Sequence, residues 1–405
     1  MSTLSPTINS QLIVQDKREQ GETVYNFGLG ANPFPPHTSL LKRFKASCHM
    51  KNYTYPDGDD ALQKIIKNHY TTSSYTVNKI LVGNGLKELL FIIQMVFKGT
   101  IIHVAPAWVS YMEQTKMLGK SVITIKGDFD NNCKLTPETL DMVLSERCDT
   151  DIDEKVLLIF NSPNNPTGIS YSKIELKELG DVINKYGEKV VVFSDEIYKN
   201  FVHDGSLGIS ISKYVPNTIC GSSLSKEAAC GGWRMAWITF PETLTYIYND
   251  AYKAISTIYS CVSQPLIEVA KEYLTNIDNF LYIRYMNKAF SHAVNQVREI
   301  LIENSMVDII PANGAWYLFL SAEKYRDKLL QHNIMDGRKL CERILNDINV
   351  VAVAGEHFGY GGYYLRLSCV DFVTYKDGNI STDETHSIMH MRNGAYNLAT
   401  WFEEL

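Results

Sequence analysis

Residues 155–168 read KVLLIFNSPNNPTG, an apolar run followed by a polar loop. The first part, from Lys155 to Phe160, is almost entirely apolar, which is typical of a strand buried on both faces of a parallel sheet. The strand ends in a polar loop rich in Asn and Pro, and α/β sheets bind ligands at this end of their strands. Asn-Pro-x-Gly alone is common turn chemistry, so a ligand site here needs support from elsewhere in the sequence.

The same pattern recurs through the middle of the chain. Short apolar, β-rich runs alternate with longer amphipathic segments, which predicts strands alternating with helices. One helix is expected over residues 172–187, because Ser172 and Glu175 have the spacing of a capping box and Gly187 can end it. The expected strands are residues 79–82, 100–104, 121–125, 155–160, 189–193 and 218–220.

After about residue 241 the pattern changes to long helical stretches. Residues 242–301 are expected to be mostly helical. The segments expected beyond them are strands at 314–320, 350–353 and 363–368, a helix at 336–347 and a C-terminal helix. This mixture predicts a second, α+β unit beside the α/β unit.

The bulk composition excludes several classes of protein. Of the 405 residues, 45% are hydrophobic and 21% are charged, as in ordinary globular proteins, and the length predicts two or three domains. The net charge of −6 argues against binding to nucleic acid or to an anionic membrane. The eight cysteines are scattered without a C-x-x-C pair, and residues 1–20 lack a signal pattern. We therefore expect a cytoplasmic protein with reduced thiols.

A carboxylate follows another of the predicted strands. The apolar run at residues 190–193 leads directly into Ser194-Asp195-Glu196-Ile197-Tyr198. In isolation, such a carboxylate is more often the N-cap of a helix than a functional group. The carboxyl ends of parallel strands meet at one edge of the sheet, however, so Asp195 is expected to lie near the loop at residues 161–168.

A lysine flanked by hydroxyls follows the predicted strand at residues 218–220. The sequence there contains Ser223, Ser225 and Lys226, with Arg234 close behind. A lone lysine is nearly always a solvated surface charge. Hydroxyls and an arginine around one lysine can, however, form an anion site beside an amine nucleophile.

Taken together, these three strand ends resemble the class I and II aminotransferases, which are fold-type I enzymes of the aspartate-aminotransferase-like superfamily. The matching motifs are Asn165-Pro166-Thr167-Gly168, Asp195-x-x-Tyr198, and Ser223-x-Ser225-Lys226 with Arg234, and the similarity extends from Gly30 to Arg366. The resemblance implies a large domain at residues 40–270, with a mostly parallel seven-stranded sheet flanked by helices. It also implies a smaller α+β domain made of residues 1–39 and 271–405.

The resemblance further implies a pyridoxal 5′-phosphate (PLP) cofactor with catalytic residues around it. Lys226 would hold PLP as a Schiff base and later act as the base that moves the substrate α-proton. Asp195 would pair with the pyridinium nitrogen, so that the ring acts as an electron sink. Asn165 and Tyr198 would hydrogen-bond the phenolic oxygen of the ring.

Other cofactor contacts follow from weaker matches. The residues that the resemblance assigns to the phosphate are Ser223, Ser225 and Arg234, with Gly85, Leu86 and Lys87 at a predicted helix start. Trp108 would stack on the ring, although a tryptophan in the core is nearly as common. Tyr53 would reach the phosphate of the partner subunit; Tyr55 is the alternative, and ordinary aromatics before a turn would look the same. A homodimer with shared active sites is therefore expected.

The substrate side of the site is expected in the C-terminal part. Arg366 lies in the apolar run at residues 363–368, and the resemblance makes it the bidentate clamp on the substrate carboxylate. Gly30 would line the same pocket, and Asn165 would also face the substrate. His386 and His390 have helical spacing that could present two metal ligands, but no third ligand lies near, so no metal is expected.

These residues predict an aminotransferase that moves an amino group between an L-amino acid and a 2-oxo acid by a ping-pong mechanism. The alternative is another PLP reaction on the same fold, such as a C–S β-lyase, a decarboxylase or a cyclising synthase, because the motifs fix the cofactor but not the bond that breaks. A remote alternative is a non-catalytic PLP-binding regulatory domain, which would need an added DNA-binding domain. The identity of the amino donor cannot be deduced from the sequence.

Overall fold

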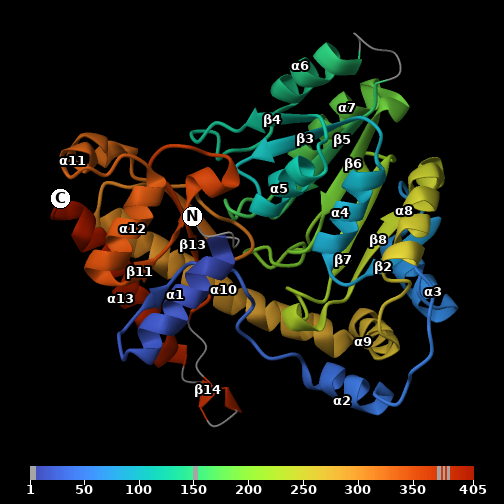
Figure 1. Ribbon diagram of the computed structural model, residues 1–405, viewed down its shortest axis with the longest axis horizontal. Helices are drawn as coiled ribbons and strands as arrows, with labels where there is room; N and C mark the ends of the chain where they lie inside the picture. The colour runs from blue at the N-terminus through green and yellow to red at the C-terminus, as the bar shows by residue number, and fades with distance from the viewer. Residues whose placement is uncertain (1–5, 149–153, 372–374, 377–378, 381–383) are drawn as a thin grey trace.

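The computed structural model of the protein describes residues 6–148, 154–371, 375–376, 379–380 and 384–405. Figure 1 shows a large twisted sheet with its helices on the right and a smaller group of helices and strands on the left. The long helix α10 (Ile277–Asn304) runs beneath both parts. The predicted boundary between a large and a small domain at residues 39/40 and 270/271 stays a prediction.

The large sheet has seven strands in the order β2-β8-β7-β6-β5-β3-β4. Five neighbouring strands run parallel, and β8 is antiparallel to both of its neighbours. The strands are β2 (Lys79–Gly83), β3 (Thr100–Ala105), β4 (Val122–Lys126), β5 (Val156–Asn161), β6 (Val190–Asp195), β7 (Thr218–Ser223) and β8 (Ala236–Phe240). This confirms the predicted α/β class and its mostly parallel seven-stranded sheet.

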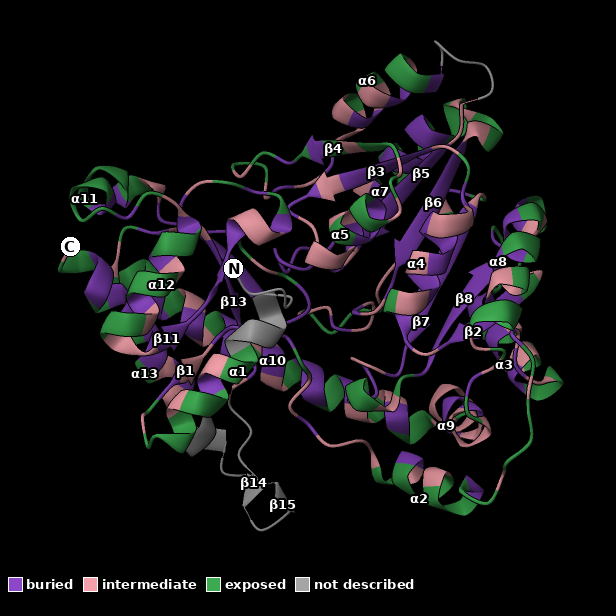
Figure 2. Cartoon of the chain, viewed as in Figure 1, coloured by how far each residue is buried: buried purple, intermediate pink, exposed green. Residues whose placement is uncertain are grey.

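Helices cover both faces of this sheet, which explains why its central strands are apolar throughout. Every residue of β5, β6, β7 and β8 is buried, as Figure 2 shows. One face packs on α4 (Leu86–Val96), α5 (Val109–Met117) and α8 (Thr245–Ile258). The other face packs on α2 (Thr38–Ser47), α3 (Asp60–Tyr70), α6 (Pro137–Cys148), α7 (Lys173–Lys185) and α9 (Gln264–Thr275). The sheet is thus the middle layer of three, as its pattern predicts.

A four-stranded sheet in the order β12-β13-β10-β9 forms the core of the smaller part. Its strands are β9 (Asp308–Ile309), β10 (Tyr317–Ser321), β12 (Val353–Ala354) and β13 (Tyr364–Ser368). The helices of this part are α1 (Pro6–Glu19), α11 (Arg326–Gln331), α12 (Gly337–Ile348) and α13 (Glu384–Glu403). Two small pairs complete the chain: β1 (Tyr25–Asn26) with β11 (Val350–Val351), and β14 (Tyr375–Lys376) with β15 (Asn379–Ile380).

Several local predictions are confirmed and others are wrong. The capping box of α7 is present, with the Ser172 and Glu175 side chains each bonded to the other's backbone. The helical stretch 242–301 is broken at residues 259–263, between α8 and α9. The predicted strand 350–353 is two short strands that belong to different sheets. Pairing with a distant strand separates them, and sequence periodicity does not reveal such pairing.

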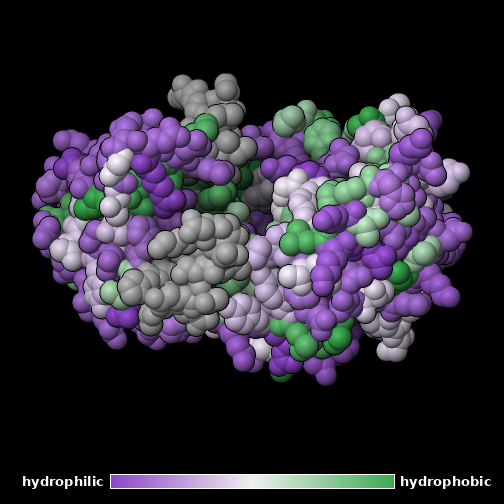
Figure 3. Space-filling view, turned by 90° about the horizontal axis from the view of Figure 1, so that it is seen from below, coloured by the Kyte–Doolittle hydropathy of each residue, from purple (hydrophilic) through white to green (hydrophobic). Residues whose placement is uncertain are grey.

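Over the residues that the structure describes, the face seen from below shows no extended hydrophobic area. Figure 3 shows mostly hydrophilic side chains, with hydrophobic ones in small separate groups. Within the part of the chain that the structure describes, no helix has the length and apolar character that crossing a membrane requires.

Candidate active site

A cavity of about 830 Å³ lies where the carboxyl ends of β5, β6 and β7 meet the smaller sheet. Strand ends of the large sheet and residues of the smaller part both line it. Among the lining residues are the predicted Gly30, Leu86, Lys87, Trp108, Asn165, Asp195, Tyr198, Ser225, Lys226, Arg234 and Arg366. The structure therefore gathers residues that lie up to 336 positions apart in the chain, from Gly30 to Arg366.

Asp195 ends strand β6 and is held in a fixed orientation. The Tyr111 hydroxyl donates to Oδ2 at 2.7 Å, and the Ile197 N–H donates to Oδ1 at 3.2 Å. The carboxyl is only 4% exposed, and burial raises its pKa to about 6, although both hydrogen bonds act in the opposite direction. A cationic group in the cavity would therefore be stabilised by this carboxylate.

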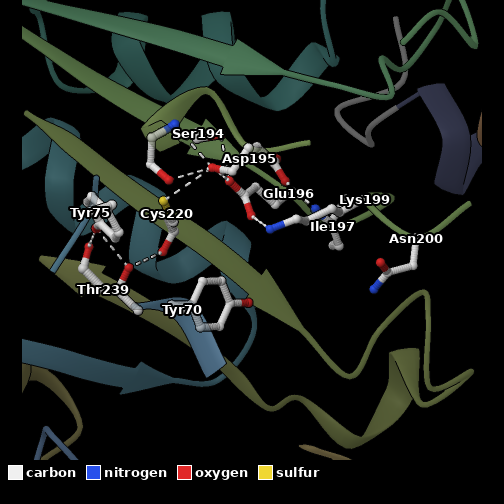
Figure 4. Close-up of polar contacts among 12 residues, drawn as sticks. Tyr70, Tyr75, Ser194, Asp195, Glu196, Ile197, Lys199, Asn200, Cys220 and Thr239 are labelled. Atoms are coloured by element: carbon white, nitrogen blue, oxygen red, sulfur yellow. Dashed lines mark hydrogen bonds and ion pairs between the residues drawn. The ribbon is translucent and has the colours of Figure 1, made fainter. Parts of the chain in front are cut away.

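The next residue, Glu196, binds on the other side of the strand end. Its carboxylate accepts bonds from the Ser194 hydroxyl at 3.1 Å and from Lys199 Nζ at 2.9 Å, as Figure 4 shows. The Ser210 hydroxyl donates to it as well. Glu196 is thus engaged by its own partners, and Asp195 is the carboxylate at this strand end that lines the cavity.

Lys226 lies in the loop after β7 with its amine in the cavity. Nζ donates to the Gly30 carbonyl and lies 5.7 Å from the Tyr198 ring centre and 5.5 Å from the Trp316 ring centre. Burial and the nearby Arg366 charge lower the pKa of this amine to about 7, while the Asp195 charge acts against them. A large share of the amine is therefore neutral, and nucleophilic, at neutral pH.

Asn165 lies between Arg366 and the carboxyl ends of β5 and β6. Its N–H donates to Asn161 Oδ1 at 2.9 Å, and Asn161 in turn donates to the Asp195 carbonyl at 2.9 Å. The Asn165 side-chain oxygen accepts from Arg366 at 3.4 Å. These bonds hold the loop at residues 161–168 against the carboxyl end of β6.

One end of the cavity is suited to an anion. Helix α4 starts at Leu86, and Gly85 precedes it with φ of 104°, a left-handed conformation that favours glycine. A Cβ on Gly85 would lie 1.9 Å from the Arg234 guanidinium, so this helix start and Arg234 form one close-fitting surface. Lys87 Nζ lies 4.9 Å from the Trp108 ring centre, and its pKa is lowered by burial and by Arg234. Helix N–H groups and a guanidinium together bind phosphate well.

The opposite side of the cavity holds a buried arginine. Arg366 is 1% exposed, and its guanidinium lies 5.0 Å from the Tyr317 ring centre and 5.1 Å from that of Phe358. It donates to the Gly28 carbonyl, and its Nε has no hydrogen-bond partner within the described part of the chain. Burial lowers its pKa from the usual value. A buried cation with an unused donor is suited to a carboxylate ligand.

Three predicted residues do not line the cavity. Gly85 lies behind Arg234, and the Ser223 hydroxyl accepts the Ser225 N–H at 3.0 Å. Tyr53 is 89% exposed and Tyr55 is 68% exposed, so neither meets the cavity of its own chain. The roles predicted for Ser223 and Tyr53 stay predictions.

Sequence reasoning missed several residues that the structure brings into the site. Tyr111, one helical turn beyond Trp108, bonds Asp195. Asn32 Nδ2 donates to the Lys226 carbonyl at 2.7 Å, and the Tyr317 hydroxyl lies 2.6 Å from that of Tyr198. Their only sequence signal is position, beside residues that the motifs single out.

A family model described as aminotransferase class I and II matches residues 22–375. The chain belongs to this family. Curated relatives are named as aminotransferases, and this chain is an aminotransferase as well.

Curated relatives span nearly the full length of this aminotransferase. It is 26% identical to an aspartate aminotransferase of Bacillus subtilis (strain 168), covering 89% of this chain and 91% of that one. It is 25% identical to an asparagine–oxo-acid transaminase of Streptococcus mutans, covering 92% and 94%. Identities in this range leave the side chain of the amino donor undetermined.

Solved structures support the fold of this aminotransferase. The aspartate aminotransferase of Thermus thermophilus with maleate superposes with a TM-score of 0.82 at 19% identity, covering 98% of this chain and 97% of that one. The aromatic aminotransferase of Pyrococcus horikoshii OT3 gives a TM-score of 0.79 at 20% identity, covering 97% and 100%. The fold of the chain is therefore the fold-type I fold that the motifs predict.

Proposed function

We propose that this aminotransferase binds PLP in the cavity and moves amino groups between an L-amino acid and a 2-oxo acid in a ping-pong cycle. One observation carries the proposal. The Lys226 amine, whose pKa is lowered to about 7, and the buried carboxyl of Asp195 line the same cavity. One end of this cavity is suited to an anion, and its other side holds the buried Arg366.

The residues present fit the chemistry of PLP. Its phosphate suits the helix start at Leu86 with Arg234 and Ser225, and the close fit of Gly85 against Arg234 leaves no room there for a side chain. Its pyridinium suits Asp195, and its flat ring suits the face of Trp108. When bound, PLP supplies an electrophilic aldehyde and a ring that withdraws electrons from the substrate.

Lys226 performs two tasks in this proposal. Its neutral amine attaches the cofactor covalently, which the lowered pKa favours at neutral pH. With its amine free in the cavity, Lys226 would take the α-proton of the substrate and return it later in the cycle.

Asp195, Tyr198 and Asn165 orient the cofactor and fix its charge. The Asp195 carboxylate, held by Tyr111 and Ile197, accepts a proton-bearing nitrogen in one orientation only. The hydroxyl of Tyr198 and the amide of Asn165 would donate to the phenolic oxygen. Both residues are almost fully buried, which strengthens such hydrogen bonds.

Arg366 binds the α-carboxylate of both substrates, since its Nε is unpartnered and its charge is buried. Gly30 would line this pocket, and a side chain does not fit there because its Cβ would lie 2.3 Å from the Tyr317 hydroxyl.

For the amino donor we propose a dicarboxylic amino acid such as aspartate. Several relatives are named aspartate aminotransferases. Lys87 also lines the cavity, and its side chain, unlike those of Lys226, Arg234 and Arg366, has no other role in this proposal. Its backbone N–H serves the phosphate, while its ammonium lies over Trp108, where it can meet a second carboxylate. An aromatic donor is the alternative that a substrate screen would detect.

We further propose a cytoplasmic homodimer with a large domain at residues 40–270. The eight free cysteines suit a reducing compartment, and the exposed Tyr53 suits a role at the neighbouring subunit's phosphate. Size-exclusion chromatography with light scattering tests the dimer. Tyr53→Phe should weaken PLP binding without changing the thermal stability of the apo-protein, and an unchanged PLP affinity would remove Tyr53 from this role.

Half-reaction spectra test the proposed function. Adding an amino donor without an oxo acid should abolish the visible band of the PLP-loaded enzyme, and 2-oxoglutarate should restore it. Release of pyruvate, ammonia or carbon dioxide in place of this cycle would instead favour a lyase or a decarboxylase.

A further inference from the structure

Tyr317 occupies the centre of a group of site residues that the proposed function assigns to different tasks. It lies on β10, is 1% exposed, and is paired in the sheet with Ser368. Its hydroxyl lies 2.6 Å from the hydroxyl of Tyr198, and its ring lies under the Arg366 guanidinium at 5.0 Å. Neither the motifs nor the family resemblance pointed to this residue.

We propose that Tyr317 is a positioning residue whose hydroxyl donates a hydrogen bond to the hydroxyl of Tyr198. This bond orients the Tyr198 hydroxyl so that it donates to the phenolic oxygen of the bound cofactor. The inference rests on the proposed function and adds a residue to it.

The proposed bond from Tyr198 to the cofactor sets the direction of this bond. One hydrogen bond joins the two hydroxyls, whose oxygens are 2.6 Å apart, so one hydroxyl donates and the other accepts. A Tyr198 that donates to the cofactor has to accept from Tyr317. The other acceptor near Tyr317 is the Gly30 carbonyl, which is 3.5 Å away and already accepts from Lys226. Tyr198 is therefore the better acceptor for the Tyr317 proton.

The surroundings hold Tyr317 in this position. The Tyr198 and Tyr317 rings meet edge to face, with centres 5.6 Å apart and planes at 89°. On the other side, Gly30 packs so closely that a Cβ would lie 2.3 Å from the Tyr317 hydroxyl. Both tyrosines are buried, so removing one hydroxyl takes away a buried hydrogen bond of the other.

The expected effect concerns the protonation of the bound cofactor. A hydroxyl that accepts one hydrogen bond becomes a stronger donor in the next, so Tyr317 strengthens the bond from Tyr198 to the phenolic oxygen. That bond stabilises the ionised oxygen and keeps the pKa of the bound cofactor low. Loss of the Tyr317 hydroxyl therefore raises this pKa.

The test is a spectrophotometric pH titration of the PLP-loaded protein without substrate. Tyr317→Phe should raise the pKa of the visible band by about half a unit to one unit, the size of one buried hydrogen bond. The matched control is Tyr363→Phe, which removes the buried bond from Tyr363 to the Ile334 carbonyl at 2.8 Å on a residue that does not line the cavity. The control should leave the pKa unchanged.

A double-variant cycle separates positioning from a general loss of structure. In a Tyr198→Phe background, Tyr317→Phe should add no further shift, because the bond to Tyr198 is already gone. An unshifted pKa in Tyr317→Phe, or an equal shift with and without Tyr198, would overturn the inference. If the wild type shows no visible band with PLP, the proposed function fails instead, and the two failures are thus distinguished.

Discussion

The Tyr111 hydroxyl donates a 2.7 Å hydrogen bond to Oδ2 of Asp195, at the carboxyl end of a buried strand. Together with the Ile197 N–H on Oδ1, this bond fixes the plane of the carboxyl before any ligand binds. Burial nevertheless outweighs both bonds and raises the pKa of Asp195 to about 6. In the apo-protein, burial therefore destabilises the ionised form of Asp195, and a cationic ligand would stabilise it.

The stability of the apo-protein should carry the signature of this carboxyl. A pKa of about 6 in the folded protein, against about 3.9 unfolded, means that the folded state binds more protons between these values. Its contribution to stability is therefore present at low pH and lost as pH rises toward 6. From pH 4 to 7, wild type should lose about 2 to 3 kcal/mol of unfolding free energy relative to Asp195→Asn.

Urea denaturation of both apo-proteins across this pH range is the measurement. Parallel pH profiles for wild type and Asp195→Asn would contradict the raised pKa. In the PLP-loaded protein, the same substitution should lower activity at least about a hundredfold, because the pyridinium loses its partner.

The rate at which PLP joins the apo-protein should depend on the protonation of Lys226. Only the neutral amine attacks an aldehyde, so the rate should rise with pH to a midpoint near 7 and then level off. Because the Asp195 charge raises the pKa of this amine, Asp195→Asn should move the midpoint to lower pH. Stopped-flow absorbance measures the rate of PLP attachment in wild type and in Asp195→Asn. A pH midpoint of this rate above 9 in wild type would indicate that Lys226 titrates like an ordinary surface lysine.

Arg366 should control the binding of both substrates. Arg366→Ala should raise KM for amino and oxo acids about a hundredfold or more, since a buried charge-assisted pair is lost. Arg366→Lys should recover only part of the loss, because a lysine cannot form two parallel bonds. The control is Arg326→Ala on the surface, where Arg326 pairs with Glu323. An unchanged KM in Arg366→Ala would remove this residue from the carboxylate role.

Lys87 should determine the preference for dicarboxylic substrates. Lys87→Ala should raise KM for aspartate and 2-oxoglutarate about ten- to a hundredfold and leave the values for alanine and pyruvate nearly unchanged. The helix N–H at this position is kept, so PLP binding should change little. Lys98→Ala, an exposed lysine just beyond the other end of α4, is the control. Equal losses for both substrate classes would indicate that the side chain serves the cofactor.

Much of the fold could be predicted from the sequence, because buried parallel strands have a simple pattern. The runs at 155–160 and 189–193 became β5 and β6 with an error of one or two residues at each end. Strand β8 was not among the expected strands. It is antiparallel and lies between β2 and β7, and its place follows from pairing with strands far away in the chain.

The site could be predicted only in part, for a related reason. Lys226, Asp195 and Asn165 stand in motifs at strand ends, where chemistry and sequence spacing coincide. Tyr111 and Tyr317 act through bonds to these residues across long separations, so only three-dimensional contact identifies them. Tyr53 is exposed in the single chain, and its role at a partner subunit stays a prediction.

The most direct measurement is borohydride reduction of the PLP-loaded protein, followed by proteolysis and mass spectrometry. Reduction makes the link between cofactor and lysine permanent, so the pyridoxyl group marks the lysine that held it. We expect a single modified peptide, the one that carries Lys226, and no modified peptide from Lys226→Ala. A pyridoxyl group on another lysine, or an unmodified Lys226 in an enzyme that still transfers amino groups, would show that Lys226 does not hold the cofactor.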